Sequence, residues 1–146
     1  MDSQIEVREA SFKEITDIHN TIEEFDTYGS EHFAERCSGK KCLILSAHID
    51  GAPAGYLVGY DRYEDGSFYC WMTGVNPEYR EKGVLKAMMD CQERWAKKRG
   101  YSRIKIKTGN TFRSMLSYLV KYGFNVADIE RYPDVSDNKI LLEKNI

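Results

Sequence analysis

The sequence predicts an α+β fold of the α/β/α-sandwich type, in which helices flank a mixed, mostly antiparallel sheet of about six to seven strands. The prediction rests first on the order of segments with a strand-like or helical apolar period, which is β-α-α-β-β-β-α-β-α-β-β. It rests second on three consecutive strand-like segments joined by tight turns, which form an antiparallel meander. The length of 146 residues suits one domain with about four helices, spanning residues 1–146.

Composition narrows the class of protein. A hydrophobic content of 42% with 12% aromatic residues is globular, and a net charge of −2 argues against general nucleic-acid binding, which requires a basic surface. Residues 1–9 are acidic and polar, unlike a signal peptide, and no apolar run approaches the roughly 18 residues that span a bilayer. We therefore expect a cytoplasmic protein with neither a nucleic-acid nor a membrane partner.

The four cysteines do not indicate a disulfide framework or a metal site. Cys37, Cys42, Cys70 and Cys91 show no C-x-x-C spacing and lie inside periodic segments. We expect them to be reduced and mostly buried, with no metal bound.

The first quarter of the chain predicts a strand and two helices. Residues 5–10 alternate apolar and charged side chains, and Ser11 with Glu14 forms a capping box for the helix that follows. His19 lies on the apolar stripe of this helix and is interpreted as a packed residue, because no second ligand stands at metal-binding spacing. Residues 23–29 are irregular, and a short helix follows over residues 31–37.

The meander occupies residues 41–75. Strands are predicted over 41–49, 54–63 and 68–75. The first turn is Asp50-Gly51, and the second contains Gly66.

The stretch after the meander predicts an anion site. An Asn-Pro pair at 76–77 ends the strand, and a helical apolar period begins after Gly83. The first amides of that helix lack internal acceptors, and Arg80, Lys82 and Lys86 add positive charge. A diphosphate suits such a turn, since glycine allows close approach of the backbone. The alternative is an ordinary basic loop that precedes a surface helix.

The second half of the chain predicts two helices and three strands. The helix after Gly83 ends at Gly100, and a strand follows over residues 103–108. The last helix is expected to begin at Gly109-Asn110 and to end at Gly123. Its core-facing residues are Phe112, Met115, Leu116 and Leu119, and its polar face carries Asn110, Ser114, Ser117 and Tyr118. Residues 124–131 and 138–144 form the closing strands.

The motif V-x-P-x-x-R-x-x-G-V-L over residues 75–85 resembles the acetyl-coenzyme A signature Q/R-x-x-G-x-G/A of the GNAT N-acetyltransferase superfamily, with Leu85 at the last small position. The N…Y…GF ending of the last helix resembles the second landmark of that superfamily, and the order of elements matches over nearly the whole chain. The resemblance implies a transferase that moves the acetyl group of acetyl-coenzyme A to a primary amine of a small molecule or a protein. Dimers are common in that superfamily, so a homodimer is possible.

By the same resemblance, the acetyl donor lies against the turn and the strand before it. The expected cofactor-binding residues are Thr73, Val75, Arg80, Glu81, Lys82, Gly83, Val84, Leu85, Asn110 and Ser114. The pantetheine arm runs along residues 73–75 like an added strand, where this strand and the one at 103–108 separate. Gly74 is a reasonable place for a bulge that opens them.

The resemblance also suggests how the reaction proceeds. The Thr73 backbone N–H lies near the thioester carbonyl, and Tyr118 protonates the leaving thiolate, with Tyr122 as the substitute. The segment between the first two helices forms a wall of the acceptor site. Its candidate contacts are Asp26, Tyr28 and His32, with Glu23, Glu24 and Glu31 beside them. No general base is singled out. The alternative function is a non-catalytic acyl-coenzyme A-binding module that acts as a sensor or partner protein.

Overall fold

A computed structural model describes residues 4–146 of the chain as one seven-stranded sheet flanked by helices. The strands are β1 (Ile5–Glu9), β2 (Cys42–Ile49), β3 (Ala52–Tyr60), β4 (Ser67–Val75), β5 (Arg103–Gly109), β6 (Asn125–Glu130) and β7 (Lys139–Asn145). The helices are α1 (Phe12–His19), α2 (Ser30–Cys37), α3 (Val84–Lys98) and α4 (Arg113–Tyr122), with short 3-10 turns η1 (Pro77–Tyr79) and η2 (Val135–Asp137).

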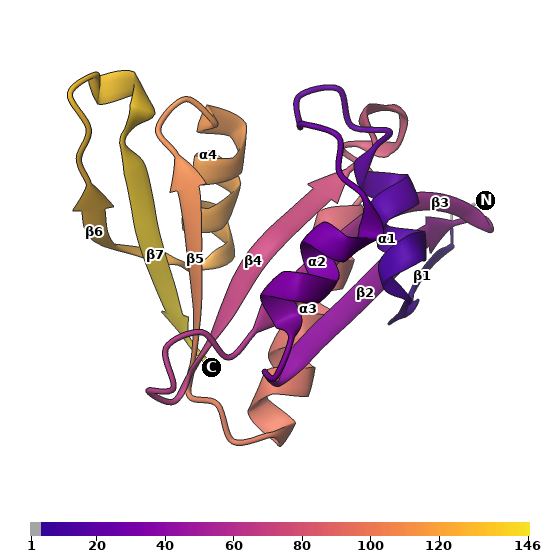
Figure 1. Cartoon of the computed structure of the whole chain (residues 1–146), viewed down its shortest axis with the longest axis horizontal. Coiled ribbons are helices and arrows are strands. Elements are labelled where there is room, and N and C mark those ends of the chain that lie inside the picture. The colour runs from indigo at the N-terminus through magenta and orange to yellow at the C-terminus, as the bar shows by residue number, and fades with distance from the viewer. Residues whose placement is uncertain (1–3) are drawn as a thin grey trace.

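The sheet has the strand order β1-β2-β3-β4-β5-β7-β6 (Figure 1). Every strand pair described in residues 4–146 is antiparallel except β4–β5. This architecture confirms the predicted mixed, mostly antiparallel α+β fold. No helix of the described chain has the length and apolar character needed to cross a membrane.

Local sequence signals set several element boundaries as predicted. The Ser11 Oγ accepts a hydrogen bond from the Glu14 N–H at 3.2 Å, which is the expected cap of α1. Asp50 and Gly51 both have positive φ, at 49° and 86°, as a tight two-residue hairpin requires.

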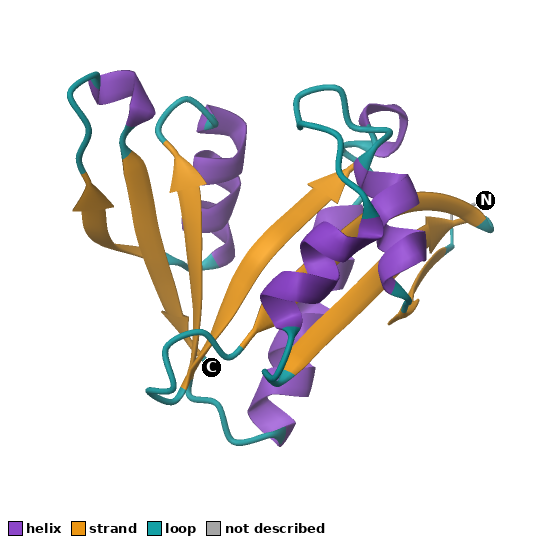
Figure 2. Ribbon diagram, in the orientation of Figure 1, coloured by secondary structure: helices purple, strands orange, loops and turns teal. Residues whose placement is uncertain are grey.

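Helices cover the two faces of the sheet with separate apolar cores (Figure 2). On one face α1 and α2 pack on alternate residues of β3 and β4, among them Tyr56, Tyr60 and Tyr69. On the other face α3 and α4 pack on the residues between these, such as Leu57 and Phe68. Because strand side chains alternate between faces, one strand serves both cores.

Strands β4 and β5 pair over only four residues and then separate (Figure 1). Ser67 to Cys70 pair with Arg103 to Ile106, and residues 71–75 of β4 and 107–109 of β5 have no partner across the gap. We call these two unpaired strand ends the split. Their divergence confirms the expectation that the two strands splay apart at this point.

The bulge in β4 lies at Trp71, so the expectation of a bulge at Gly74 is wrong. Gly74 pairs regularly with Tyr56, and the register shifts between Cys70 and Met72. Gly74 is needed for another reason: a Cβ there would lie 2.6 Å from the Ile22 Cδ1 atom. The glycine therefore permits close packing of the segment after α1, and the extra residue at Trp71 bends the strand.

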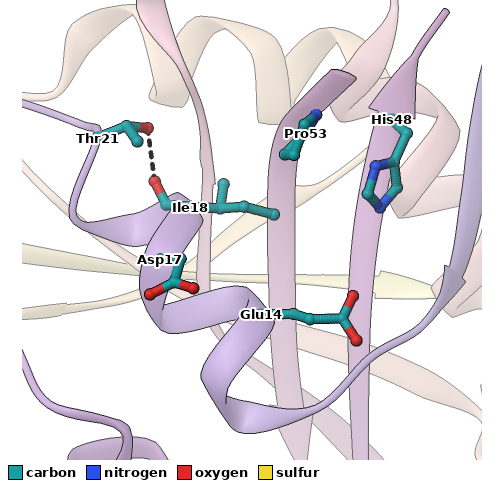
Figure 3. A pocket seen from close by; sticks show the side chains of 6 residues that line it. All are labelled: Glu14, Asp17, Ile18, Thr21, His48 and Pro53. Atoms are coloured by element: carbon teal, nitrogen blue, oxygen red, sulfur yellow. Dashed lines mark hydrogen bonds between the residues drawn. The ribbon is translucent and has the colours of Figure 1, made fainter. Parts of the chain in front are cut away.

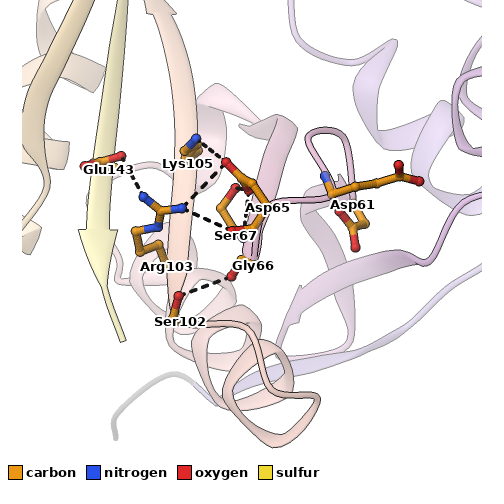
Figure 4. A network of polar contacts seen from close by, with 9 residues as sticks. Asp61, Asp65, Gly66, Ser67, Ser102, Arg103, Lys105 and Glu143 are labelled. Carbon is orange, nitrogen blue, oxygen red and sulfur yellow. Dashed lines mark hydrogen bonds and ion pairs between the residues drawn. The ribbon is translucent and has the colours of Figure 1, made fainter.

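A polar network joins the two strands below the split (Figure 4). The Asp65 carboxylate accepts hydrogen bonds from the Ser67 N–H at 3.0 Å and from the Lys105 Nζ at 2.8 Å, and it pairs with Arg103 at 3.6 Å. These donors hold the pKa of Asp65 well below its usual range, with Lys105 making the largest contribution. The turn before β4 is thereby tied to β5.

The start of the last helix differs from the prediction. Helix α4 begins at Arg113, and Phe112 precedes it with 49% of its surface exposed, so Phe112 does not face the core. The cause is a tertiary contact: the Asn110 N–H donates to the Asn138 carbonyl, and the Asn110 Nδ2 donates to the Val135 carbonyl. These bonds hold the residues before α4 in a turn. The expected core position of Leu119 is confirmed, since it is fully buried. The expected polar-face position of Tyr118 is wrong, because its ring stacks with that of Tyr122 and packs against the core with a buried hydroxyl.

Candidate functional site

The turn before α3 presents backbone amides without side-chain acceptors. Gly83 occupies the N-cap position with φ 87°, makes no side-chain cap, and is followed by no acidic residue in the first helical turn. Glu81 also has positive φ, at 63°, which is uncommon outside glycine. The first N–H groups of a 15-residue helix therefore remain available at its positive end. This geometry suits an anion.

Arg80 connects this turn to the segment after α1. Its Nε donates to the Val75 carbonyl at 3.1 Å, and its two terminal nitrogens meet the Glu24 carboxylate at 3.2 and 2.6 Å. The hydrogen bonds from Arg80 lower the pKa of Glu24. The Arg80 charge is thus balanced within the protein, and Lys86 is likewise paired with Asp90.

One edge of β4 faces the split with unpaired backbone groups. The Asn76 N–H points to β3, because it donates to the Ala54 carbonyl at 2.8 Å. Neighbouring residues of a strand direct their backbone groups to opposite sides, so those of Val75 and Thr73 point away from β3. The Arg80 bond to the Val75 carbonyl agrees with this direction. The Thr73 N–H has no strand beside it, and its hydroxyl donates to the Tyr56 carbonyl at 2.9 Å.

Two tyrosines of α4 differ sharply in their hydrogen bonding. Tyr118 and Tyr122 stack with ring centroids 5.7 Å apart. The Tyr122 hydroxyl donates to Asp90 at 2.6 Å, whereas the Tyr118 hydroxyl is buried without a partner in residues 4–146. Burial raises the pKa of Tyr118 to about 12, and burial together with the Asp90 bond raises that of Tyr122 further.

The remaining predicted cofactor residues lie at the start of α4. Ser114 is exposed in its first turn. The Asn110 amide nitrogen is bonded to the Val135 carbonyl, so this side chain also holds the β6–β7 connection in place. Asn110 therefore has a structural role that its position in the motif did not reveal.

The predicted acceptor wall is an aromatic stack. The rings of Tyr28 and His32 lie 3.7 Å apart at an interplanar angle of 11°, and Tyr28 also stacks on His19 at 5.0 Å. Asp26 contributes its carbonyl, which lies 2.7 Å from the His19 Nε2. Tyr28 and His32 are therefore brought together, whereas the exposed Asp26 is held through its backbone.

His19 is fully buried, as the interpretation of a packed residue requires. A carbonyl only accepts, so the His19 Nε2 carries the proton and its Nδ1 accepts from the Tyr56 hydroxyl at 2.6 Å. Burial lowers the pKa of His19. The ring thus fixes the segment that carries the acceptor wall.

Trp71 is the residue at the split that the sequence interpretation missed. It is the first β4 residue beyond the pairs with β5, and its ring lies 5.4 Å from that of His32. The alternation of Tyr69 and Trp71 with Phe68 and Cys70 could have placed its side chain on the α1–α2 face. Its position at the split is set by the end of the β4–β5 pairing at Cys70, which no local pattern shows.

A hollow of about 280 Å³ lies elsewhere, between α1 and the β2–β3 hairpin (Figure 3). Its lining residues are Glu14, Asp17, Ile18, Thr21, His48 and Pro53. None of these is among the predicted site residues. Within residues 4–146 no group of three His, Cys, Asp or Glu side chains is arranged to hold a metal, and all four cysteines are free thiols.

Comparison with known proteins agrees with the fold and the motifs. Residues 8–124 match the model of the acetyltransferase (GNAT) family. The chain therefore belongs to the GNAT acetyltransferase family.

Solved structures share the fold at low sequence identity. The ribosomal-protein-S18-alanine N-acetyltransferase from Escherichia coli superposes with a TM-score of 0.82 at 17% identity, covering 98% of this chain and 94% of that chain. The PaiA N-acetyltransferase from Thermoplasma acidophilum in complex with coenzyme A has a TM-score of 0.78 at 20% identity, covering 98% and 99%. A GNAT family acetyltransferase from Elizabethkingia anophelis with acetyl-coenzyme A bound has a TM-score of 0.76 at 18% identity, covering 99% of both chains.

The residues of this chain fit a donor that carries a diphosphate and an amide-rich arm. The uncapped start of α3 and the left-handed Gly83 suit the diphosphate. The free edge at Thr73 and Val75 suits an extended arm that adds to the sheet. The buried, unpartnered hydroxyl of Tyr118 is available for a polar atom of a bound molecule.

Proposed function

We propose that this protein is an N-acetyltransferase that moves the acetyl group of acetyl-coenzyme A to a primary amine by direct attack. The observation that carries the proposal is the uncapped N-terminus of α3 beside the unpaired edge of β4. Arg80, Lys82 and the amides from Gly83 to Leu85 form the diphosphate side of the site. Thr73 and Val75 form the side along the arm, with Glu81, Val84, Asn110 and Ser114 at its margins.

Thr73 stabilises the negative charge that develops when an amine attacks. Acetyl-coenzyme A supplies the acetyl group as a thioester, and attack places charge on the carbonyl oxygen. The Thr73 N–H is fixed by β3–β4 pairing and directed into the split, so it is oriented before the reaction begins. Such preorganisation avoids the reorganisation that water requires.

Tyr118 is the general acid of the proposal, and its hydrogen bonding favours it over Tyr122. A leaving thiolate requires a proton from a neutral donor. Burial raises the pKa of the Tyr118 hydroxyl to about 12, so the group is protonated at neutral pH, and it has no acceptor in the described chain that would commit its proton elsewhere. The Tyr122 proton is committed to Asp90 at 2.6 Å.

The amine approaches from the α1–α2 face. The turn at residues 80–83, which we call the donor turn because the proposal places the diphosphate of the acetyl donor there, precedes α3, and α3 covers the opposite face of the sheet. An acceptor that meets the thioester in the split therefore comes from the side of Trp71 and His32. Asp26, Tyr28 and His32 contribute to its binding. Water or a carboxylate of this segment takes the amine proton.

The alternative is a module that binds acyl-coenzyme A without turnover. One observation favours it: the hydroxyl of Tyr118, the proposed general acid, is buried within the chain, whereas a general acid must reach the leaving thiolate. Binding without catalysis would still use the amides of α3.

A single assay separates the two functions. Free-thiol release from acetyl-coenzyme A is measured across a panel of amines, alongside calorimetric binding of coenzyme A. The transferase gives release that depends on the amine and saturates with it. Binding of coenzyme A with no release above the hydrolysis rate for any amine would support the module, and no binding would contradict both.

A further inference from the structure

The α1–α2 face carries two arginines that lie on aromatic rings, one over Trp71 at the start of the split and one over Tyr69 in the paired part of β4. The Arg36 guanidinium carbon lies 4.9 Å from the Trp71 ring centroid, and that of Arg62 lies 4.9 Å from the centroid of Tyr69. Arg36 belongs to α2, whereas Arg62 belongs to the turn between β3 and β4. Two distant segments therefore place the same type of group over neighbouring residues of one strand.

The two arginines are linked through a continuous aromatic floor. Tyr60 and Tyr69 are an antiparallel pair with centroids 5.8 Å apart, and Tyr60 lies 6.0 Å from Trp71. Tyr60 and Tyr69 are 2% and 4% exposed, so they form a rigid base. The Arg36 Nη1 also approaches the Tyr60 hydroxyl at 3.5 Å. Arg36 thus lies beside Tyr60 and Arg62 over Tyr69, and the rings of these two tyrosines are in contact.

Neither arginine has a carboxylate partner in residues 4–146. The neighbouring cations of β5 are paired: Lys105 contacts Asp65 at 2.8 Å, and Lys107 contacts Glu130 at 3.0 Å. Stacking on a ring uses the flat face of a guanidinium and leaves its N–H donors at the edge. These donors therefore remain available to an external carboxylate.

Arg80 shows how an arginine of this chain binds a carboxylate. Arg80 binds the Glu24 carboxylate with both terminal nitrogens, at 3.2 and 2.6 Å. Arg36 and Arg62 have the same donors and lack the acid. Their aromatic supports hold them in place without one.

We propose that Arg36 and Arg62 form a subsite for a carboxylate carried by the amine acceptor, an inference that rests on the proposed transferase function. Trp71 begins the split and lies under Arg36, so this subsite adjoins the point where the amine must attack. The preferred acceptors are therefore molecules with an amine and a carboxylate separated by a short chain. Neutral amines of the same size have no carboxylate for the two arginines to bind.

The test measures kcat/KM, referred to the unprotonated amine of each acceptor, with pairs in which a neutral carboxamide replaces the carboxylate. Glycine, β-alanine and 4-aminobutyrate are compared with their carboxamides, and the chain length measures the separation of the two anchors. We expect the wild-type protein to prefer the carboxylate of at least one pair by about tenfold or more, the size of one charge-assisted hydrogen bond. Equal turnover of carboxylates and carboxamides in all three pairs would overturn the proposal.

Variants assign the preference to the two arginines. Arg36→Gln and Arg62→Gln should each reduce the ratio of carboxylate to carboxamide turnover about tenfold, while Arg36→Lys retains part of it. The matched control is Arg99→Gln, because Arg99 also lies on an indole ring, 4.2 Å from the Trp95 centroid, at the far end of α3. A ratio unchanged in both Arg36→Gln and Arg62→Gln, or equally reduced in Arg99→Gln, would contradict the subsite.

A binding measurement keeps the subsite testable if no acceptor is turned over. The absence of thiol release across the panel would remove the transferase function. Calorimetric titration of N-acetylglycine, N-acetyl-β-alanine and N-acetyl-4-aminobutyrate against their amides then decides the subsite alone. Tighter binding of the acids that is lost in Arg36→Gln supports it, and equal or undetectable binding of acids and amides overturns it.

Discussion

The strands on the two sides of the split differ in how much of their surface is buried. On one side, β2, β3 and β4 are covered by α3 on one face and by α1 and α2 on the other, and most of their residues are buried. On the other side, every residue of β6 is exposed, including Val126 at 56% and Ile129 at 45%. We call these the N-terminal arm, residues 4–98, and the C-terminal arm, residues 103–146.

The two arms supply different residues of the proposed site. The well-packed N-terminal arm holds the donor turn and the Thr73 amide, which must be fixed before the reaction. The thinner C-terminal arm carries Tyr118 and Tyr122. The two arms meet through the four residue pairs of β4 and β5, through the Asp65 network, and through contacts of α3 with the C-terminal arm such as Tyr122 with Asp90.

The largest expected effect is the loss of donor binding at the N-terminal arm. Gly83→Glu places a negative side chain at the uncapped start of α3 and should abolish calorimetric binding of coenzyme A while the protein stays folded. The matched control is Gly100→Glu, since Gly100 has nearly the same φ, 86° against 87°, at the opposite end of α3. Equal loss in both variants would mean that backbone strain, rather than the site, is responsible.

The next effect tests the C-terminal arm. Tyr118→Phe removes one oxygen and should reduce kcat on the order of 10²-fold, with coenzyme A affinity nearly unchanged. Because the pKa of Tyr118 is raised to about 12, this group should cause no alkaline loss of kcat below about pH 11. The Tyr122→Phe protein is the comparison. If it loses turnover while Tyr118→Phe keeps it, the acid is one helical turn further along α4.

A smaller effect tests the junction of the arms. Asp65→Asn removes the charge that Lys105 and Arg103 share and should lower the free energy of unfolding by about 1 kcal/mol, since the pair is partly exposed. Amide hydrogen exchange should quicken in β5, β7 and β6 more than in β2 and β3. Asp50→Asn, in the distant β2–β3 turn, is the control. Uniform quickening of both arms would mean that they open as one unit.

The smallest effect is a pH dependence within the N-terminal arm. Burial lowers the pKa of His19, so the unfolded chain binds a proton near pH 6.5 that the folded chain does not. The stabilising effect is complete above pH 6.5 and decreases as the pH falls toward the folded pKa. The midpoint of thermal unfolding should therefore fall between pH 7 and 5, and His19→Gln should flatten this slope. An unchanged slope in the His19→Gln protein would mean that other groups cause the pH dependence of the unfolding midpoint.

Local chemistry allowed much of the fold to be predicted from the sequence. Ser11 with Glu14 fixed the start of α1, Asp50-Gly51 fixed a hairpin, and Gly83 fixed the start of α3, each through contacts within a few residues. The β-α-α-β-β-β-α-β-α-β-β order and the motif at residues 75–85 predicted the family, which the match over residues 8–124 confirms. The predicted contacts of this turn with coenzyme A stay predictions.

Tertiary structure decided what depends on segments far apart in the chain. Arg80 meets Glu24 across 56 residues, Asn110 is bonded near Val135, and Arg36 lies on Trp71. No local period encodes such contacts, because the same side chains satisfy the helical or strand pattern whichever partner they find. The bulge at Trp71 follows the same rule, since Gly74 was the better local candidate but pairs regularly with Tyr56 and packs against the distant Ile22. The sequence alone thus determined the elements and the turn before α3, and packing across the sheet decided which charges remain unpaired in the described residues.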